Sequence, residues 1–268
     1  MDRYLRVFKF TFEVWGMAKQ NRTLFKPVLY NIVFAAPLMF VLAVLLGLTE
    51  SQGLAYTLLA AGVTALYFID YFCAGLTTSL IFDQVTTGQA DFAVAKQRAK
   101  AAASGILIFA AISAAFDLLA SYAQERDDIL GKVLTSILYA VWTTATFVVM
   151  PAMVLEGLSF GTAFSRSKQL MKQDPTNVGT GVIGIAAANY VLGGVVFTLA
   201  YYADAGLSHI HPIAGAMAFF TLVNVYWAVS GFLKISYFTC FYLWARECEA
   251  KQSDSPDLAP APLAAALA

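Results

Sequence analysis

The sequence predicts an all-α fold, a polytopic membrane bundle of six transmembrane helices with amphipathic interfacial helices on the cytoplasmic side. Hydrophobic residues make up 59% of the 268 residues and charged residues only 13%, which is more apolar than a soluble domain of this length. Six apolar segments reach the roughly 20 residues that a helix needs to cross a ~30 Å hydrocarbon core. Nearly all lysines and arginines also lie on one side of these segments.

The six apolar segments are separated by short polar stretches. They cover residues 27–48, 54–82, 101–120, 133–155, 178–202 and 213–244. Pro37 lies inside the first segment, where it is placed to kink the helix. The fifth segment is rich in glycine, which permits close helix approach. Asn189 lies in this fifth segment and Asn224 lies in the sixth. Either amide could hydrogen-bond to a neighbouring helix, so both are candidate interhelical polar residues.

The cationic residues divide unevenly between the two sides of these segments. Of 17 lysines and arginines, 14 lie before the first segment or after the second, fourth and sixth. Only Arg126 and Lys132 lie in the other connections, and Lys234 lies inside a segment. Cytoplasmic loops carry an excess of positive charge, so this asymmetry predicts that both termini are cytoplasmic.

Residues 1–26 are predicted to form an interfacial helix that lies flat on the membrane. Leu5, Phe8, Phe12 and Trp15 recur at helical spacing, while charged residues occupy another face. Residues 90–100 and 159–173 predict two further basic helices, so the chain resembles three units of an interfacial helix followed by a hairpin. Cations on the first and third of these helices are candidate contacts for lipid headgroups: Arg3, Arg6, Lys9, Arg166, Lys168 and Lys172.

The chain is predicted to contain one folded domain. Residues 1–249 form the six-helix membrane domain in this interpretation, and residues 250–268 form a disordered cytoplasmic tail. The tail consists largely of Ala, Pro, Ser and Asp, and it has too few large apolar residues for a core. The non-cytoplasmic connections are too short to fold as domains.

Asp70 and Lys234 form a candidate intramembrane polar pair. A charged side chain at the centre of a membrane helix costs about 2.5–3.5 kcal/mol on insertion scales, and such residues usually pair or line a pathway. Both residues precede the cytoplasmic end of their segment by a similar number of residues, which predicts similar depths near the midplane. We expect them to contact each other or to share a polar cavity. We favour an ion pair that fixes helix register, or a Lys234 side chain that snorkels to the interface, over a path for a proton, ion or substrate.

Other motifs favour structural over catalytic roles. Residues 157–161 match the hydrolase pattern G-x-S-x-G. They follow an apolar segment, so we interpret Gly157 as a helix exit and Ser159 as the cap of the next helix. The only histidines, His209 and His211, with Asp204 nearby, are a weaker pattern than the three or four ligands of a zinc site. We therefore predict no catalytic residue, no metal and no cofactor.

Three stretches of the chain carry a family resemblance. Residues 147–172, residues 237–247 and residues 12–26 resemble an uncharacterised family of six-helix prokaryotic integral membrane proteins. That family is distantly similar to the membrane domain of some glycerophosphodiester phosphodiesterases. The resemblance implies a prokaryotic plasma (inner) membrane. The phosphodiesterase domain itself is absent, so its activity is not carried over, and the matching residues have no assigned role to transfer: Pro151, Glu156, Ser167 and Arg246.

The function predicted from the sequence is that of an integral membrane protein without catalytic activity. It would serve as a scaffold, an accessory subunit or a lipid-organising component. Its expected partners are the lipid bilayer, including anionic lipids, and a membrane protein partner or a second copy of the chain. A net charge of zero gives no support for nucleic acid binding. The alternative is a transporter or channel for a small solute or ion that uses Asp70 and Lys234, and an intramembrane enzyme is least favoured.

Overall fold

The structure is a computed structural model that describes residues 2–125, 142, 146, 148–173, 175–253 and 255–267. Within these residues every regular element is a helix, which confirms the all-α prediction. Short 3-10 helices occur at Arg22–Phe25 and Pro256–Leu258. The α-helices are α1 (Asp2–Gln20), α2 (Lys26–Gly47), α3 (Gln52–Thr87), α4 (Phe92–Ala101), α5 (Ala103–Glu125), α7 (Val149–Glu156), α8 (Phe160–Gln173), α9 (Pro175–Ser208), α10 (Pro212–Lys251) and α11 (Ala261–Leu267).

Several helices are long and apolar enough to cross a membrane. Five such stretches lie in the described residues, at Arg22–Gly47, Gln52–Thr87, Ala103–Ser121, Asn189–Ser208 and Pro212–Lys251. Each overlaps one of the predicted segments. The remaining predicted segment, residues 133–155, falls largely outside the described residues, and α7 is the helix described at its end. The structure therefore supports a multi-pass membrane protein, and the count of six spans stays a prediction.

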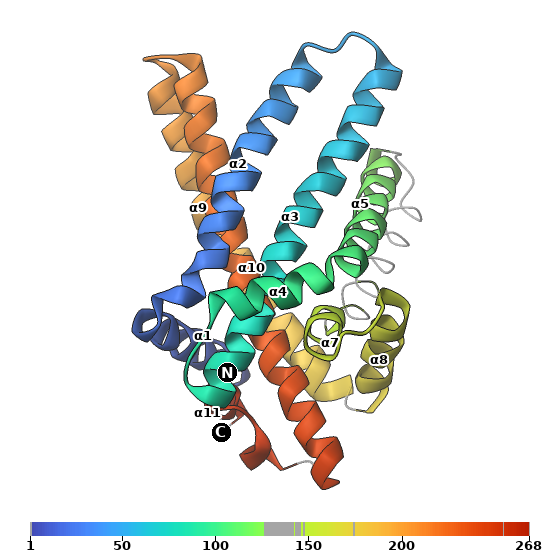
Figure 1. Cartoon of the computed structure of the whole chain (residues 1–268). Coiled ribbons are helices and arrows are strands. Elements are labelled where there is room, and N and C mark those ends of the chain that lie inside the picture. Colours follow the sequence, from blue (N-terminus) through green and yellow to red (C-terminus); the bar gives the residue numbers. More distant parts are fainter. Residues whose placement is uncertain are drawn as a thin grey trace.

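The long helices pass from an open upper half into a compact lower half. In Figure 1 the upper parts of α2, α3, α9 and α10 stand apart from the short helices, which gather around the lower parts of α3 and α10. Burial follows the same division, because residues 73–81 of α3 and residues 235–244 of α10 are all buried. The compact core of the protein is therefore in the lower half.

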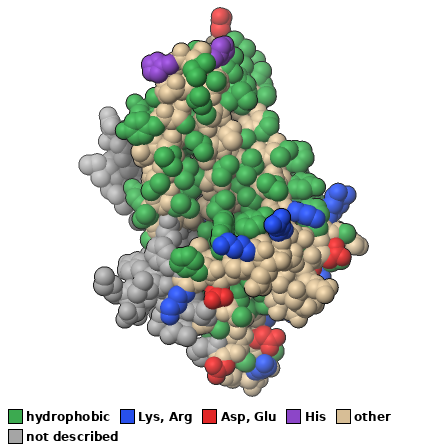
Figure 2. All heavy atoms as spheres, turned by 90° about the vertical axis from the view of Figure 1, so that its left-hand side faces the viewer, with side chains coloured by type: hydrophobic (Ala, Val, Ile, Leu, Met, Phe, Trp, Pro, Cys, Tyr) green, Lys and Arg blue, Asp and Glu red, His purple; other side chains and the backbone are tan. Residues whose placement is uncertain are grey.

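The upper half exposes many large hydrophobic side chains. On α2 and α9 they include Leu29, Val33, Phe34, Tyr190, Val191 and Val195. Figure 2 shows this apolar face with a row of Lys and Arg side chains beneath it and the His side chains at its far end. Contiguous exposed apolar surface of this extent marks contact with lipid or protein. Cations at one border of the band are the arrangement expected at a cytoplasmic membrane surface.

Helices form at each of the three places where interfacial helices are predicted. They are α1, α4 and α8. One face of α1 is buried, and it carries Phe10, Val14 and Ala18 at helical spacing. The ring of Phe10 meets that of Tyr237 on α10 edge-on, with centroids 5.2 Å apart. Phe12, on another face of α1, is 73% exposed and is available to lipid, so the interfacial position of this helix remains a prediction.

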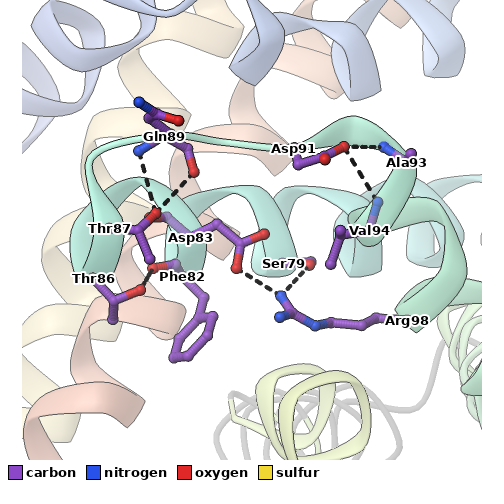
Figure 3. Close-up of polar contacts among 10 residues, drawn as sticks. All are labelled: Ser79, Phe82, Asp83, Thr86, Thr87, Gln89, Asp91, Ala93, Val94 and Arg98. Carbon is purple, nitrogen blue, oxygen red and sulfur yellow. Dashed lines mark hydrogen bonds and ion pairs between the residues drawn. The ribbon is translucent and has the colours of Figure 1, made fainter.

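The turn between α3 and α4 is held by side-chain caps and an ion pair. Gly88 ends α3 with a φ of 76°, a left-handed conformation that favours glycine. The Asp91 carboxylate caps α4 and accepts a hydrogen bond of 2.7 Å from the Ala93 amide. Arg98 of α4 reaches back to Asp83 of α3, with 2.8 Å between Nη1 and Oδ1 (Figure 3). These contacts fix α4 across the lower part of α3.

The C-terminal tail differs from the prediction of disorder. Residues 261–267 form α11, and Leu263 of this helix is 1% exposed within the core that also contains Phe10 of α1. The indole of Trp244 donates a hydrogen bond of 3.1 Å to the Ser255 carbonyl oxygen, which directs the chain back toward α1. The many alanines of the tail favour a helix, and a single leucine supplies its buried anchor.

Candidate functional site

A polar cavity lies where the open upper half of the bundle meets the compact lower half. Its volume is about 140 Å³, and its walls come mainly from α2, α3, α5 and α10. We call it the first chamber. Its polar lining residues are Asn31, Tyr67, Asp70, Tyr71, Thr77, Ser113, Asp117, Thr146 and Lys234. Such a density of polar groups between apolar helices makes this chamber the candidate site.

Asp70 and Lys234 both line the first chamber. Asp70 lies on α3 and Lys234 on α10, and their opposite charges attract each other. Both are described residues, yet no direct ion pair joins their side chains. A β-carbon at Gly231, which precedes Lys234 by one turn, would lie 3.6 Å from Asp70 Oδ1. The backbone of α10 therefore passes close to the carboxylate, while the two charges face a shared space.

The Asp70 carboxylate has a hydrogen-bond partner on α2. The Asn31 side-chain amide donates to Asp70 Oδ1 at 3.1 Å. Asn31 follows Lys26, the first residue of α2, by five positions, which is about 8 Å along a helix. Asp70 is thus held beside the lysine-bearing end of α2, and its depth in a membrane stays a prediction.

A second carboxylate in the first chamber was missed by the sequence analysis. Asp117 lies on α5 and accepts a hydrogen bond from the Tyr67 hydroxyl of α3. One turn below, the Tyr71 hydroxyl bonds to Ser113 Oγ at 2.9 Å. Asp117 is an acidic residue inside the third apolar segment, the same signal that identified Asp70. That signal was therefore sufficient to find it.

A second chamber of about 170 Å³ adjoins the first. The two share five lining residues: Asn31, Tyr67, Asp70, Asp117 and Trp227. The rest of the second chamber is lined mainly by aliphatic groups and Met39, with Asn224 as its additional polar residue. The two carboxylates therefore stand in the wall between a polar chamber and a more apolar one.

The two predicted interhelical asparagines have different surroundings. The amide nitrogen of Asn224 is 3.9 Å from Met39 Sδ on α2, which is a weak contact. Asn224 Oδ1 is buried and has no hydrogen-bond partner among the described residues. Asn189 acts through its backbone instead, because its carbonyl oxygen accepts a 2.9 Å hydrogen bond from the Tyr226 hydroxyl on α10. Of the two side chains, only that of Asn224 lines a chamber.

Ion pairs also join helices α7 and α8 to α10. Arg166 of α8 pairs with Glu249 of α10 through both guanidinium nitrogens, and this hydrogen bonding raises the pKa of Arg166. Arg246 of α10 lies 3.6 Å from the carboxylate of Glu156 on α7. Arg166 therefore has a protein partner, while its contact with a lipid headgroup stays a prediction. Glu156 and Arg246 connect α7 to α10.

The other predicted headgroup contacts are only partly described. Lys9 is exposed on α1. Lys168 is exposed on α8, and its ammonium lies 5.4 Å from the centre of the Phe164 ring, within cation–π range. Both remain available to a membrane surface. The remaining side chains lie outside the described set: Arg3, Arg6 and Lys172.

The motifs that resemble catalytic or metal sites have structural roles. Gly157 ends α7 with a φ of 67°, and Ser159 Oγ accepts a hydrogen bond of 3.4 Å from the Thr162 amide at the start of α8. This agrees with the predicted helix exit and cap. His211 caps α10 by accepting from the Ile213 amide at 3.2 Å. Within the described part of the chain, no three metal-ligating side chains cluster.

Comparison with known proteins places the chain in a family without giving it an activity. No curated protein and no solved structure matches it. The family of unknown function DUF6159 matches residues 53–253. This range runs from the start of α3 to the end of α10 and includes Asp70, Asp117 and Lys234. The chain therefore belongs to the DUF6159 family.

Proposed function

We propose that this protein binds a small solute or ion within the membrane and moves it across, as a transporter or channel. The observation that carries the proposal is the first chamber, with Asp70, Asp117 and Lys234 in its walls. Its volume of about 140 Å³ is well above the roughly 15 Å³ needed for one water molecule. Ionisable groups between membrane helices are costly and commonly mark a substrate or ion path.

The contacts of Asp70 favour this role over a structural ion pair. A buried ion pair offsets its desolvation only through close contact and further hydrogen bonds. Asp70 instead binds the neutral amide of Asn31, and no direct ion pair joins it to Lys234, which lines the same chamber. Both groups therefore border the space that a ligand would occupy.

The charges in the walls favour a cation. Two carboxylates, Asp70 and Asp117, and one ammonium, Lys234, line the first chamber. With all three ionised, the walls carry one net negative charge. A monovalent cation would neutralise it, and charge complementarity of this kind concentrates a ligand of opposite sign.

The test is the electrical current produced by the purified protein in proteoliposomes. Rapid exchange to sodium, potassium, ammonium or ethylammonium salts should give a current that is absent from protein-free vesicles. The variant Glu247→Gln, which changes an exposed carboxylate elsewhere on α10, should keep the current. Silence with every cation, from protein that is folded and correctly inserted, would contradict the proposal.

A non-enzymatic scaffold, accessory subunit or lipid-organising component is the second proposal. It is supported by the cations that border the apolar band, among them Lys9, Lys19, Arg22 and Lys26. Each could attract anionic headgroups by about 1 kcal/mol. The proposal includes six spans, interfacial α1, α4 and α8, and a plasma membrane with both termini cytoplasmic. The distant similarity to phosphodiesterase membrane domains stays a prediction and adds no activity.

The scaffold proposal has its own test. Protein extracted in native nanodiscs should carry more anionic lipid than the surrounding membrane, or should retain a partner protein. The enrichment should fall when Lys19, Arg22 and Lys26 are replaced by glutamine. Lipid at the bulk composition and a chain without partners would contradict this second role.

A further inference from the structure

We infer that the second chamber binds an organic ammonium ion, that is, a protonated amine with a small apolar body. This inference rests on the proposed function and specifies its substrate class. It comes from the two carboxylates that line the chamber and from the aliphatic and aromatic groups of its other walls.

The acceptors come from three different helices. Asp70 on α3, Asp117 on α5 and Asn224 on α10 all line the second chamber. Asn224 is 2% exposed, and its Oδ1 has no partner among the described residues. Asn224 precedes Gly231, whose β-carbon would lie 3.6 Å from Asp70 Oδ1, by seven residues, which is about 10 Å along a helix. The carboxylates and this amide therefore line different parts of the chamber.

The carboxylates retain room for a ligand. Asp70 receives one hydrogen bond from Asn31, and Asp117 receives one from Tyr67. An ionised carboxylate has about four lone-pair positions, so each can accept further bonds. An alkylammonium group has three N–H donors, and the remaining acceptor positions of Asp70 and Asp117 can receive them.

The remaining walls suit an apolar body. They include Ala35, Met39, Val63 and Leu66, together with Trp227. An aromatic ring within about 6 Å of a cation can add about 0.5–2 kcal/mol of attraction. The chamber volume of about 170 Å³ is close to the ~150 Å³ of an apolar cavity that admits benzene. A body of about four to six carbon atoms therefore fits.

A bare metal ion would fit the second chamber less well than an alkylammonium ion. Calcium and magnesium prefer about six or more oxygen ligands around the ion. Here the oxygen-bearing groups stand beside aliphatic side chains such as Val63 and Leu66. A metal ion would leave that apolar space unfilled, whereas an alkylammonium ion would occupy both parts.

The test is calorimetric titration of the protein in nanodiscs with n-butylammonium, n-butanol and ammonium. We expect n-butylammonium to bind, ammonium to bind at least tenfold more weakly, and n-butanol to give no saturable heat. Asp117→Asn should weaken n-butylammonium binding by at least tenfold. Asn189→Ala is the matched control on α9, because that side chain lines neither chamber, and it should bind as the unmodified protein does.

Melting temperatures of each variant separate lost binding from lost folding. A folded Asp117→Asn variant with unchanged affinity, or equal binding of n-butanol and n-butylammonium, would overturn the inference. Currents with inorganic cations but no n-butylammonium binding would also overturn it, and would leave the proposed transport function standing. Saturable n-butylammonium binding without any current would support the site and contradict transport.

Discussion

The side-chain amide of Asn31 donates a hydrogen bond to Asp70 Oδ1 across 3.1 Å. This contact joins α2 to α3 in the wall that the two chambers share. Asn31 is 4% exposed, so its amide has little access to water and needs a protein acceptor. The same bond supplies a donor to Oδ1 of the Asp70 carboxylate and holds the carboxylate in one orientation.

Replacing Asn31 should disturb both stability and transport. In Asn31→Leu the Asp70 carboxylate loses its neutral donor, which should lower the free energy of unfolding by about 1–3 kcal/mol. The transport current should also fall, because the carboxylate is no longer held in place. Unfolding by denaturant in detergent and the proteoliposome current measure the two effects. Unchanged values of both would contradict the role assigned to this hydrogen bond.

The ion pair between Asp83 and Arg98 should contribute to stability (Figure 3). Asp83 is 8% exposed and shares Arg98 with Ser79 Oγ, which lies 2.9 Å from Arg98 Nη1. Asp83→Ala leaves a partly buried guanidinium without its carboxylate and should cost about 1–3 kcal/mol. Glu247→Ala is the control, since its pair with Lys251 is exposed and should be worth under about 0.5 kcal/mol. Equal effects on unfolding would contradict this ranking.

Close packing at Gly215 should make the turn between α9 and α10 sensitive to substitution. A β-carbon there would lie 2.7 Å from the Asp204 carbonyl oxygen, so Gly215→Ala must separate the two helices. We expect a loss of about 1–3 kcal/mol, as for other overpacked sites. At Gly194 a β-carbon would meet nothing within 4 Å. Gly194→Ala should therefore leave the melting temperature unchanged or raise it. An equal fall in melting temperature in both variants would contradict this prediction.

The C-terminal helix should depend on Leu263. This side chain is 1% exposed, and removing a buried leucine costs about 2–5 kcal/mol. Because α11 is short, Leu263→Ala should detach it without unfolding the bundle. The amides of residues 263 and 264 both donate to the Pro260 carbonyl oxygen, and their hydrogen exchange should then become fast while α3 stays protected. Rapid exchange of the same residues in the unmodified protein would show that α11 is not docked.

The apolar periodicity was sufficient to predict the helices but not how far they extend. Lengths of about 20 apolar residues identified α2, α3, α5, α9 and α10. The lower part of α3, however, is buried by protein and reaches Thr87. An apolar helix covered by lipid and one covered by protein have similar composition, so the sequence alone does not show where the protein-covered part of α3 begins.

The site was only partly predictable for a related reason. A charge within an apolar segment is a local signal, and it identified Asp70 and Lys234. Asp117 carries the same signal and was missed. The contacts of Asn31 and Tyr67, by contrast, depend on how α2, α3 and α5 are arranged in space, which no local pattern encodes. The docking of α11 likewise depends on one leucine that finds a site on distant helices.

The most direct test compares transport current and stability in the double variant Asp70→Asn, Lys234→Met. This variant removes both charges together and leaves neither one unpaired, so the fold should persist. If these residues serve a transport path, the melting temperature should change little while the current falls at least tenfold. A current at the level of the unmodified protein in this folded variant would show that the two charges have no part in transport.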